Sequence, residues 1–325
     1  MHLGLDIGGA NLKAATADGR AVSVPFALWK EPDKLPSALA ELAAQFPETT
    51  EFAVTMTGEL CDCFETKSDG VRTIVAAVTA VAGNRAVRIW STVGEFVSPE
   101  EAIANHMAVA AANWHALATF VGRYNPHGTS LLVDIGSTTT DIIPIVNGRV
   151  RSIGKTDPER LQSGELVYMG VKRTPVCAML APGIGAAEFF ATMQDVYVLL
   201  GNLPEYADDR DTADGRPVTK QHAHARLSRM LCGDPVITSQ ADTYRLAVEL
   251  AQRQRMIVAD RIMAANDLGN MAITSGSGEF LARDALRECQ HLFTQMLSLT
   301  EKLGPAIAAC APAYAVAVLA AERPR

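Results

Sequence analysis

The sequence predicts an α/β protein made of two similar domains with a cleft between them. Two segments carry this prediction, residues 6–13 and 134–141, because each places an Asp-x-Gly turn and small polar residues directly after an apolar run. Such a turn lacks bulky side chains, so backbone N–H groups and hydroxyls can close on a phosphate oxygen. One loop from each domain would hold a polyphosphate from both sides.

Hydrophobic patterning predicts the elements of the first domain, residues 1–122. The expected strands are 1–7, 12–17, 51–56, 72–82 and 86–90. A helix is expected over 36–46, where the large apolar residues fall on one side. Ser98 and Glu101 have the residue types and the spacing of a capping box. A second helix should therefore begin there, run to about Thr119 and close the domain.

Turn-forming residues at 122–128 mark the boundary to the second domain, residues 128–325. This domain repeats the order of strand, Asp-x-Gly loop and strand, and its Asn147-Gly148 pair predicts a tight hairpin turn. The further expected elements are a strand at 141–146, helices at 183–200, 219–230 and 239–264, a strand at 271–274, a helix at 279–288 and a helical stretch at 304–321. Whether that last helix packs on the first domain is left open.

Composition and charge exclude several classes of protein. The 325 residues carry a net charge of −7 with a pI near 5.5, which gives no basic surface for nucleic acid. The longest apolar stretch, 107–122, is too short to span a bilayer. The first apolar run contains Asp6 and follows no charged segment, unlike a signal peptide. Six scattered cysteines are typical of free thiols. We expect a cytoplasmic protein that binds neither nucleic acid nor membranes.

The loop residues predict how a magnesium-bound phosphate would be held. Asp6 and Asp134 are the expected Mg²⁺ ligands, because carboxylates beside phosphates are hard oxygen donors for this ion. The expected phosphate contacts are Gly8, Gly9, Asn11, Lys13, Gly136, Ser137, Thr138 and Thr139. For Lys13, a solvated lysine at a strand edge is an equal alternative. Walker and Rossmann sites are excluded, since neither G-x-x-x-x-G-K-[ST] nor G-x-G-x-x-G occurs.

A third glycine-containing segment, 272–278, places Gly276, Ser277 and Gly278 after an apolar strand near the C-terminus. In this order the three segments resemble the phosphate-1, phosphate-2 and adenosine motifs of the superfamily that contains actin, Hsp70 and the sugar kinases. The resemblance spans nearly the whole chain and implies a two-domain actin-like ATPase (ribonuclease H-like) fold with an interdomain cleft. It also implies that these three residues form an adenosine loop, and it leaves open whether ATP is bound.

Three further blocks, 56–62, 163–168 and 210–217, resemble the hydantoinase/oxoprolinase-like proteins linked to tetrahydromethanopterin-dependent one-carbon metabolism and to methanofuran biosynthesis. That resemblance implies a transferase that joins an (aminomethyl)furan-methanol diphosphate to the phenol oxygen of a tyramine- or tyrosine-derived acceptor and releases diphosphate. The product would be part of a methanofuran- or methylofuran-type C1 carrier. The expected partners are these two small molecules, and a homodimer is the assembly to test.

The same blocks supply the catalytic candidates. Glu59 follows the strand 51–56, at the carboxyl end where open α/β sheets place their sites, although a turn glutamate in solvent is the alternative. Glu165 occurs in a similar Ser-Gly-Glu-Leu context. Either carboxylate could take the phenol proton or stabilise positive charge on the furfuryl carbon. Lys67 lies in a polar stretch predicted to be a loop, and the resemblance alone makes it an anion-binding candidate.

An acidic loop at 205–214 invites metal-binding interpretations that fail on residue identity. An EF-hand would need an oxygen ligand where Ala213 stands and a glutamate where Lys220 stands. A solvated charged loop is therefore the first interpretation, and binding of a cationic amine is the alternative.

Two other functions stay open on the sequence. The adenosine-like segment favours an ATP-dependent small-molecule kinase or a hydantoinase-type amidohydrolase, since a diphosphate transferase has no evident need for that segment. The chaperone branch of the superfamily suggests a nucleotide-gated binding protein. ATP turnover stimulated by a small substrate would favour the first, and nucleotide binding without turnover would favour the second.

Overall fold

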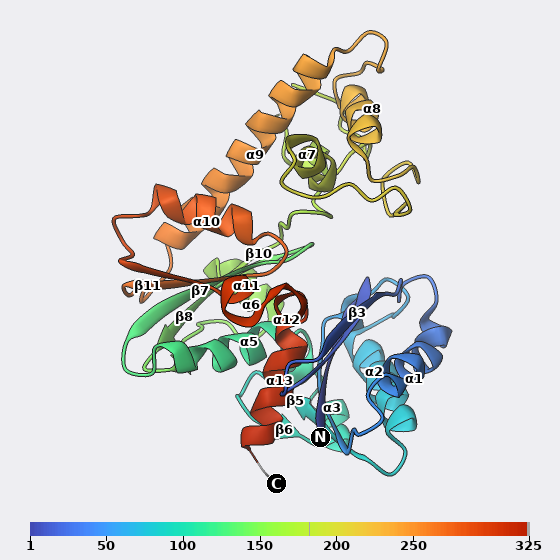
Figure 1. The fold of residues 1–325 in the computed structure, drawn as a ribbon, viewed down its shortest axis with the longest axis vertical. Coiled ribbons are helices and arrows are strands. Elements are labelled where there is room, and N and C mark those ends of the chain that lie inside the picture. The colour runs from blue at the N-terminus through green and yellow to red at the C-terminus, as the bar shows by residue number, and fades with distance from the viewer. Residues whose placement is uncertain (182, 324–325) are drawn as a thin grey trace.

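The computed structural model describes residues 1–181 and 183–323 and contains two mixed β-sheets that follow one another along the chain (Figure 1). The strand order of the first sheet is β3-β2-β1-β4-β5-β6. Its strands are β1 His2–Ile7, β2 Asn11–Thr16, β3 Ala21–Pro25, β4 Glu51–Met56, β5 Ala86–Trp90 and β6 Phe96–Val97. Strands β1, β4 and β5 run parallel, whereas β2, β3 and β6 pair antiparallel with their neighbours.

The second sheet repeats this plan around β7. Its strand order is β10-β8-β7-β11-β12, and β9 pairs with β8. Its strands are β7 Thr129–Ile135, β8 Thr140–Val146, β9 Arg149–Val150, β10 Leu166–Val167, β11 Met271–Ser275 and β12 Gln295–Ser298. The β7–β8 hairpin corresponds to β1–β2, and the parallel strands β11 and β12 correspond to β4 and β5. Two sheets of one plan agree with the predicted fold class.

Helices cover both sheets, and α7 and α8 lie beside the far part of α9, which runs back to α10 at the second sheet (Figure 1). The helices are α1 Leu35–Ala44, α2 Lys67–Ala82, α3 Pro99–Ala104, α4 His106–Val109, α5 Asn113–Val121, α6 Asp157–Ser163, α7 Met193–Leu200, α8 Lys220–Met230, α9 Gln240–Met263, α10 Glu279–Glu288, α11 Leu299–Leu303, α12 Pro305–Ala309 and α13 Ala311–Glu322. In the described part of the chain, no helix is long and apolar enough to cross a membrane. The boundary proposed at 122–128 stays a prediction, and these residues lie between α5 and β7.

The C-terminal helix α13 returns to the first sheet, where it packs against β1, β2 and β4 and also against α5 (Figure 1). One hydrophobic cluster contains Ala53 of β4, Leu132 of β7 and Val316 of α13. The helix therefore joins the cores of the two sheets. Its backbone comes so close to β1 that a Cβ atom on Gly4 would overlap the carbonyl of Ala313. Only glycine allows this approach.

We expect Gly4→Ala to lower the free energy of unfolding by about 3 kcal/mol, because the overlap is with backbone atoms that cannot rotate away. Urea denaturation measures the change. Gly136→Ala is the matched control, since the nearest atom to a Cβ there is 3.6 Å away. This control should change the stability by less than about 0.5 kcal/mol. Equal stabilities of the two variants would contradict the close approach.

Two predictions within residues 64–82 are wrong. Residues 72–82, predicted as a strand from their hydrophobic pattern, form the body of α2, whose buried Val71, Ile74, Val75 and Val78 follow helical spacing. Tertiary burial of that face overrides local β-propensity. Lys67, predicted in a loop, is the first residue of this helix.

The helix predicted from Ser98 to Thr119 is broken. It begins with the expected capping box, but α3 ends at Ala104, and α4 and α5 cover the remaining residues. Ala111, between α4 and α5, has a φ of 49°, which a right-handed helix does not contain. The helix predicted at 183–200 is also shorter, because only Met193–Leu200 is helical there.

Several elements were not predicted at all, among them helix α6 and the edge strands β3, β6, β10 and β12. Strands β3 and β12 are short, and few of their residues are buried, so hydrophobic alternation gives little signal. By contrast, the Asn147-Gly148 turn connects β8 and β9 as expected, and both residues have positive φ.

Candidate active site

The two Asp-x-Gly loops occupy equivalent positions in the two sheets. Asp6 lies near the end of β1 and pairs across the hairpin with Lys13 of β2. Asp134 lies near the end of β7 and pairs across the hairpin with Asp141 of β8. Equivalent strands therefore deliver one carboxylate each to the carboxyl end of a sheet, where α/β proteins place their ligands.

The turns themselves have the same hydrogen bond. The Gly8 N–H donates to the Asn11 carbonyl at 3.0 Å, and the Gly136 N–H donates to the Thr139 carbonyl at 2.8 Å. In the second loop, the hydroxyls of Ser137 and Thr138 lie 3.3 Å apart. The two predicted loops thus share one conformation, and both lack bulky side chains where a phosphate would approach. The phosphate contacts assigned to them stay predictions.

The two carboxylates influence each other electrostatically. Burial raises the pKa of Asp134 to about 7, and negative charge on Asp141 and Asp6 adds to that rise. The Lys13 Nζ lies 3.8 Å from an Asp6 oxygen and favours the ionised form of both groups. The pKa of Asp6 is also raised, mainly by burial. Asp6 and Asp134 are 128 positions apart in the sequence, yet negative charge on Asp6 contributes to the raised pKa of Asp134.

This arrangement fits a divalent cation shared with a phosphate. Asp6 Oδ1 is buried and has no hydrogen-bond partner, as expected of an oxygen that is free to accept a cation. Among the residues that the structure describes, no group of three His, Cys, Asp or Glu side chains could hold a metal alone. Oxygens of the substrate and of water would have to complete the coordination, as is common for Mg²⁺.

The adenosine-like segment packs directly on the second loop. Gly276 has a φ of 89°, and a Cβ atom there would lie 2.7 Å from Asp134 Oδ1. The Gly278 N–H donates to the Ile135 carbonyl at 2.8 Å. Ser277 is exposed. Both glycines thus have a packing reason that is independent of any nucleotide, and the adenosine role stays a prediction.

Glu59 is buried, and among the described residues no well-formed hydrogen bond reaches either of its carboxylate oxygens. It lies in a short 3₁₀ turn after β4, as expected, and the alternative of a turn glutamate in solvent is wrong. Burial raises its pKa to about 7, while positive charge on Lys67 opposes the rise. Gly70 of α2 packs on its backbone, since a Cβ atom there would lie 2.7 Å from the Glu59 Cα. The result is a fixed carboxyl group whose pKa suits proton transfer near neutral pH.

Lys67 connects the two sheet-bearing halves of the chain. Its Nζ lies 3.3 Å from Asp157 on α6. Asp157 in turn lies 3.9 Å from the guanidinium of Arg160, which forms a 2.5 Å ion pair with Asp141. Sequence reasoning missed Asp157 and Arg160. The sequence offered one indication of this network, because Asp141 lies within the second loop motif and a buried carboxylate needs a positively charged partner.

Glu165 is held by hydrogen bonds from neighbouring residues. Its carboxylate accepts from the Ile153 N–H at 2.7 Å, the Gly154 N–H at 2.9 Å and the Ser163 hydroxyl at 2.8 Å, with the Ser152 hydroxyl at 3.3 Å. The side chain therefore ties the segment after β9 to the end of α6. The carboxylate of Glu165 therefore accepts several hydrogen bonds, whereas the carboxylate of Glu59 accepts no well-formed one.

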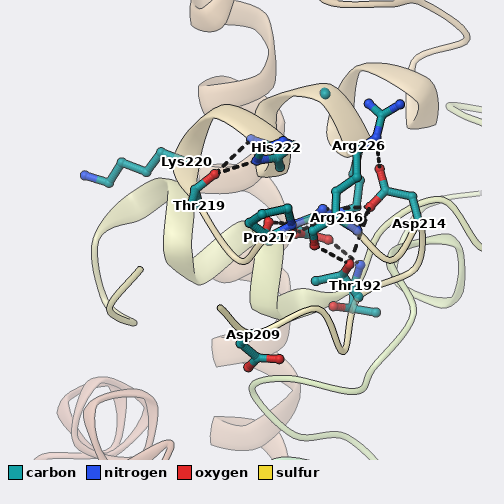
Figure 2. A network of polar contacts seen from close by, with 12 residues as sticks. Thr192, Asp209, Asp214, Arg216, Pro217, Thr219, Lys220, His222 and Arg226 are labelled. Atoms are coloured by element: carbon teal, nitrogen blue, oxygen red, sulfur yellow. Dashed lines mark hydrogen bonds and ion pairs between the residues drawn. The ribbon is translucent and has the colours of Figure 1, made fainter. Parts of the chain in front are cut away.

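The acidic loop before α8 is anchored by a buried arginine. Figure 2 shows Asp214 joined to Arg226, whose guanidinium is 1% exposed and also pairs with Asp195 on α7. Lys220 points away from this network (Figure 2). The ion pair with Arg226 accounts for the negative charge at Asp214, the last acidic residue of the loop, and no bound amine or metal is needed to balance it.

A cavity of about 810 Å³ lies away from the loops, between α7, α8 and α9. Its lining includes Leu199, His224, Tyr244 and Val248. It contains neither a loop residue nor Glu59, so its size alone does not make it the reaction site. The paired carboxylates and Glu59 supply the reactive groups, and we place the candidate site there.

Residues 51–323 match the family model described as hydantoinase/oxoprolinase, which spans most of the chain. The chain belongs to the hydantoinase/oxoprolinase family. Within curated proteins, it is 34% identical to the (4-{4-[2-(gamma-L-glutamylamino)ethyl]phenoxymethyl}furan-2-yl)methanamine synthase of Methanocaldococcus jannaschii, over 98% of this chain and 97% of the relative. The synthase of the same name from Methanococcus vannielii is 34% identical, over 62% of this chain and 95% of the relative.

Solved structures give the fold of this hydantoinase/oxoprolinase family member. The nucleotide-free acetone carboxylase structure superposes with a TM-score of 0.54 at 11% identity and covers 98% of this chain and 70% of that one. The ROK hexokinase from Thermus thermophilus gives a TM-score of 0.46 at 18% identity, with 99% of both chains covered. The first match and the paired sheets confirm the actin-like fold class predicted from the three loops.

Proposed function

We propose that this hydantoinase/oxoprolinase family member is the synthase that joins an (aminomethyl)furan-methanol diphosphate to the phenol oxygen of a tyramine- or tyrosine-derived acceptor. Its similarity to two synthases named for such a phenoxymethylfuran product supports the reaction class. One structural observation carries the proposal. Paired carboxylate loops suited to a diphosphate occur in a chain that also buries an unpartnered glutamate, Glu59.

The reaction exchanges one carbon–oxygen bond for another. The phenol oxygen forms a bond to the furfuryl methylene carbon, and the bond from that carbon to the diphosphate oxygen breaks. The leaving diphosphate takes the bonding electron pair, and the phenol loses its proton. Glu59 is our candidate acceptor of that proton, because its pKa of about 7 keeps a useful fraction ionised at neutral pH.

Asp6 and Asp134 are the residues that would hold Mg²⁺, since one buried Asp6 oxygen is unpartnered and the two carboxylates occupy equivalent positions in the two hairpins. The bound ion would neutralise negative charge on the leaving diphosphate. The small residues of both turns leave room for phosphate oxygens, and Lys13 adds a positive charge beside them.

The other two candidates receive different roles. The hydrogen bonds to Glu165 favour a positioning role, in which this carboxylate fixes the segment between β9 and α6. Lys67 acts through Asp157, by linking α2 to α6 near Glu59. We therefore place proton transfer on Glu59 alone.

The reaction as written needs no ATP. Gly276 and Gly278 are explained by their packing on the second loop, so they do not by themselves favour a kinase or an amidohydrolase. We further propose a cytoplasmic enzyme of small molecules, in line with the net charge of −7, and a homodimer remains a prediction for sizing experiments.

The decisive assay supplies Mg²⁺, the aminomethylfuran-methanol diphosphate and either tyrosine or glutamyl-tyramine, without ATP. We expect the phenoxymethyl ether and free diphosphate by mass spectrometry. Parallel incubations with ATP and each substrate serve as the comparison. Product only in the presence of ATP, or ADP release without the ether, would contradict the proposal.

A further inference from the structure

A cation–π pair joins the two halves of the chain beside the phosphate loops. The guanidinium carbon of Arg173 lies 4.8 Å from the centroid of the Trp29 ring. Trp29 follows β3 in the first half, and Arg173 follows β10 in the second half. Within the described residues Arg173 forms no ion pair with a carboxylate, although its side chain is exposed.

Each partner of this pair is tied to one of the two loops. The residue before Trp29, Leu28, donates its N–H to the Gly9 carbonyl at 2.9 Å. The Arg173 N–H donates to the Ser137 carbonyl at 2.9 Å. The backbones of the first and second loops therefore set the positions of Trp29 and Arg173, respectively. A ligand that draws the loops together would also move this pair.

The positive charge of Arg173 acts on a residue beside the first loop, Cys61. Burial raises the pKa of the Cys61 thiol to about 11, and the Arg173 guanidinium opposes that rise. The Cys61 sulfur lies 2.7 Å from the position that a Cβ atom on Gly9 would take. A cation fixed to the second loop thus lies near the glycine turn of the first. Lys13, the lysine within the loops, already neighbours Asp6.

We propose that Arg173 is the cross-loop ligand of a diphosphate, held in place by Trp29 until the anion binds. A guanidinium donates two parallel N–H bonds to phosphate oxygens and is more weakly hydrated than an ammonium, so it can exchange an aromatic face for an anion. A cation–π contact at a partly exposed site is weak enough to be replaced. The released Trp29 face then lies beside the diphosphate, where an aromatic furan can stack on it.

The identity of the anion rests on the proposed function, whereas the anion site itself can be tested without turnover. Trp29 is a useful reporter, because the other two tryptophans of the chain, Trp90 and Trp114, are buried. Titration with inorganic pyrophosphate and Mg²⁺ should change the tryptophan fluorescence of the native protein, and Trp29→Phe should abolish most of that change. An unchanged response in Trp29→Phe would overturn the role of Trp29.

Affinity tests the role of Arg173. Arg173→Ala should raise the Kd for pyrophosphate about tenfold or more, measured by calorimetry, since a charge-assisted hydrogen-bond pair is lost. Arg173→Lys should recover only part of the affinity, because an ammonium lacks the planar fork. Arg287→Ala is the matched control, because it removes the same positive charge from α10, where Arg287 pairs with Asp284. The Kd of this variant for pyrophosphate should equal that of the native protein. A native Kd in Arg173→Ala, or an equal loss in Arg287→Ala, would overturn the proposal.

The same variants separate this inference from the synthase assignment. If pyrophosphate binding depends on Arg173 but no ether forms in the assay, the anion site stands and the assigned reaction fails. If the ether forms with a native KM for the diphosphate substrate in Arg173→Ala, the reaction stands and the role of Arg173 fails. Support for both requires a raised KM for the diphosphate substrate with an unchanged KM for the phenol.

Discussion

Glu59→Gln is expected to lower kcat about a hundredfold or more and, at the same time, to stabilise the folded protein at pH 8. The amide has nearly the shape of the carboxyl group but cannot accept the phenol proton, and general-base catalysis contributes about 10²–10⁴ in rate. The stability gain follows from the site. Both oxygens of Glu59 are buried without a well-formed hydrogen bond, so ionisation there is costly.

The direction of the pH dependence follows from the raised pKa. The folded state holds the Glu59 proton up to about pH 7, whereas the unfolded chain releases it near the ordinary value of 4.5. The folded state therefore binds more protons between these values, and stability falls as the pH rises through them. At pH 8 the full penalty is present, on the order of 3 kcal/mol. Glutamine removes it, so the gain should be large at pH 8 and much smaller at pH 5.

Two measurements check this expectation. Urea denaturation at pH 5 and pH 8 gives the stability difference, and kcat/KM of the native enzyme should rise as the pH increases through about 7. Glu41→Gln, on the exposed side of α1, is the matched control and should change neither quantity. Native turnover in Glu59→Gln would remove Glu59 as the proton acceptor, even if the stability gain were observed.

Local sequence was enough to locate the two Asp-x-Gly loops and to place Glu59 after the end of a strand. Each of these features depends on a few consecutive residues, such as a strand followed by an Asp-x-Gly turn. The burial of Glu59 was not predictable in this way. It depends on Gly70, which packs on its backbone from the next helix, and on the chain near Ala111, which lies between two helices that were predicted as one.

The same limit explains the elements that were missed. The residues of α2 have strand propensity when taken alone, and only the buried helical face against the first sheet decides the conformation. The pairing of Lys67 with Asp157, and of Arg160 with Asp141, joins residues from different elements. Side-chain contacts at such sequence separations leave no local pattern, so a single sequence could nominate Lys67 but could not supply its partner.

Arg160→Met is expected to lower the free energy of unfolding by about 3–5 kcal/mol, because removing one partner of a buried ion pair leaves the other uncompensated. Arg160 is 1% exposed, pairs with Asp141 at 2.5 Å and lies 3.9 Å from the centroid of the Trp114 ring. Without the guanidinium, Asp141 would be a buried carboxylate, and burial already raises its pKa. Asp157 would keep only its contact with Lys67 among the ion pairs of the described residues.

The double variant Arg160→Met with Asp141→Asn separates charge from packing. If the loss comes from the unpaired carboxylate, the neutral asparagine should recover much of the stability, whereas a loss that comes from the Trp114 contact would persist. Urea denaturation at pH 7 distinguishes the two. The ion-pair explanation would be contradicted if Arg160→Met had the same free energy of unfolding as the native protein, or if the double variant were no more stable than Arg160→Met. Recovery would show that Asp141, which occupies the position of Lys13 in the other hairpin, needs Arg160 to stay charged beside the second Asp-x-Gly loop.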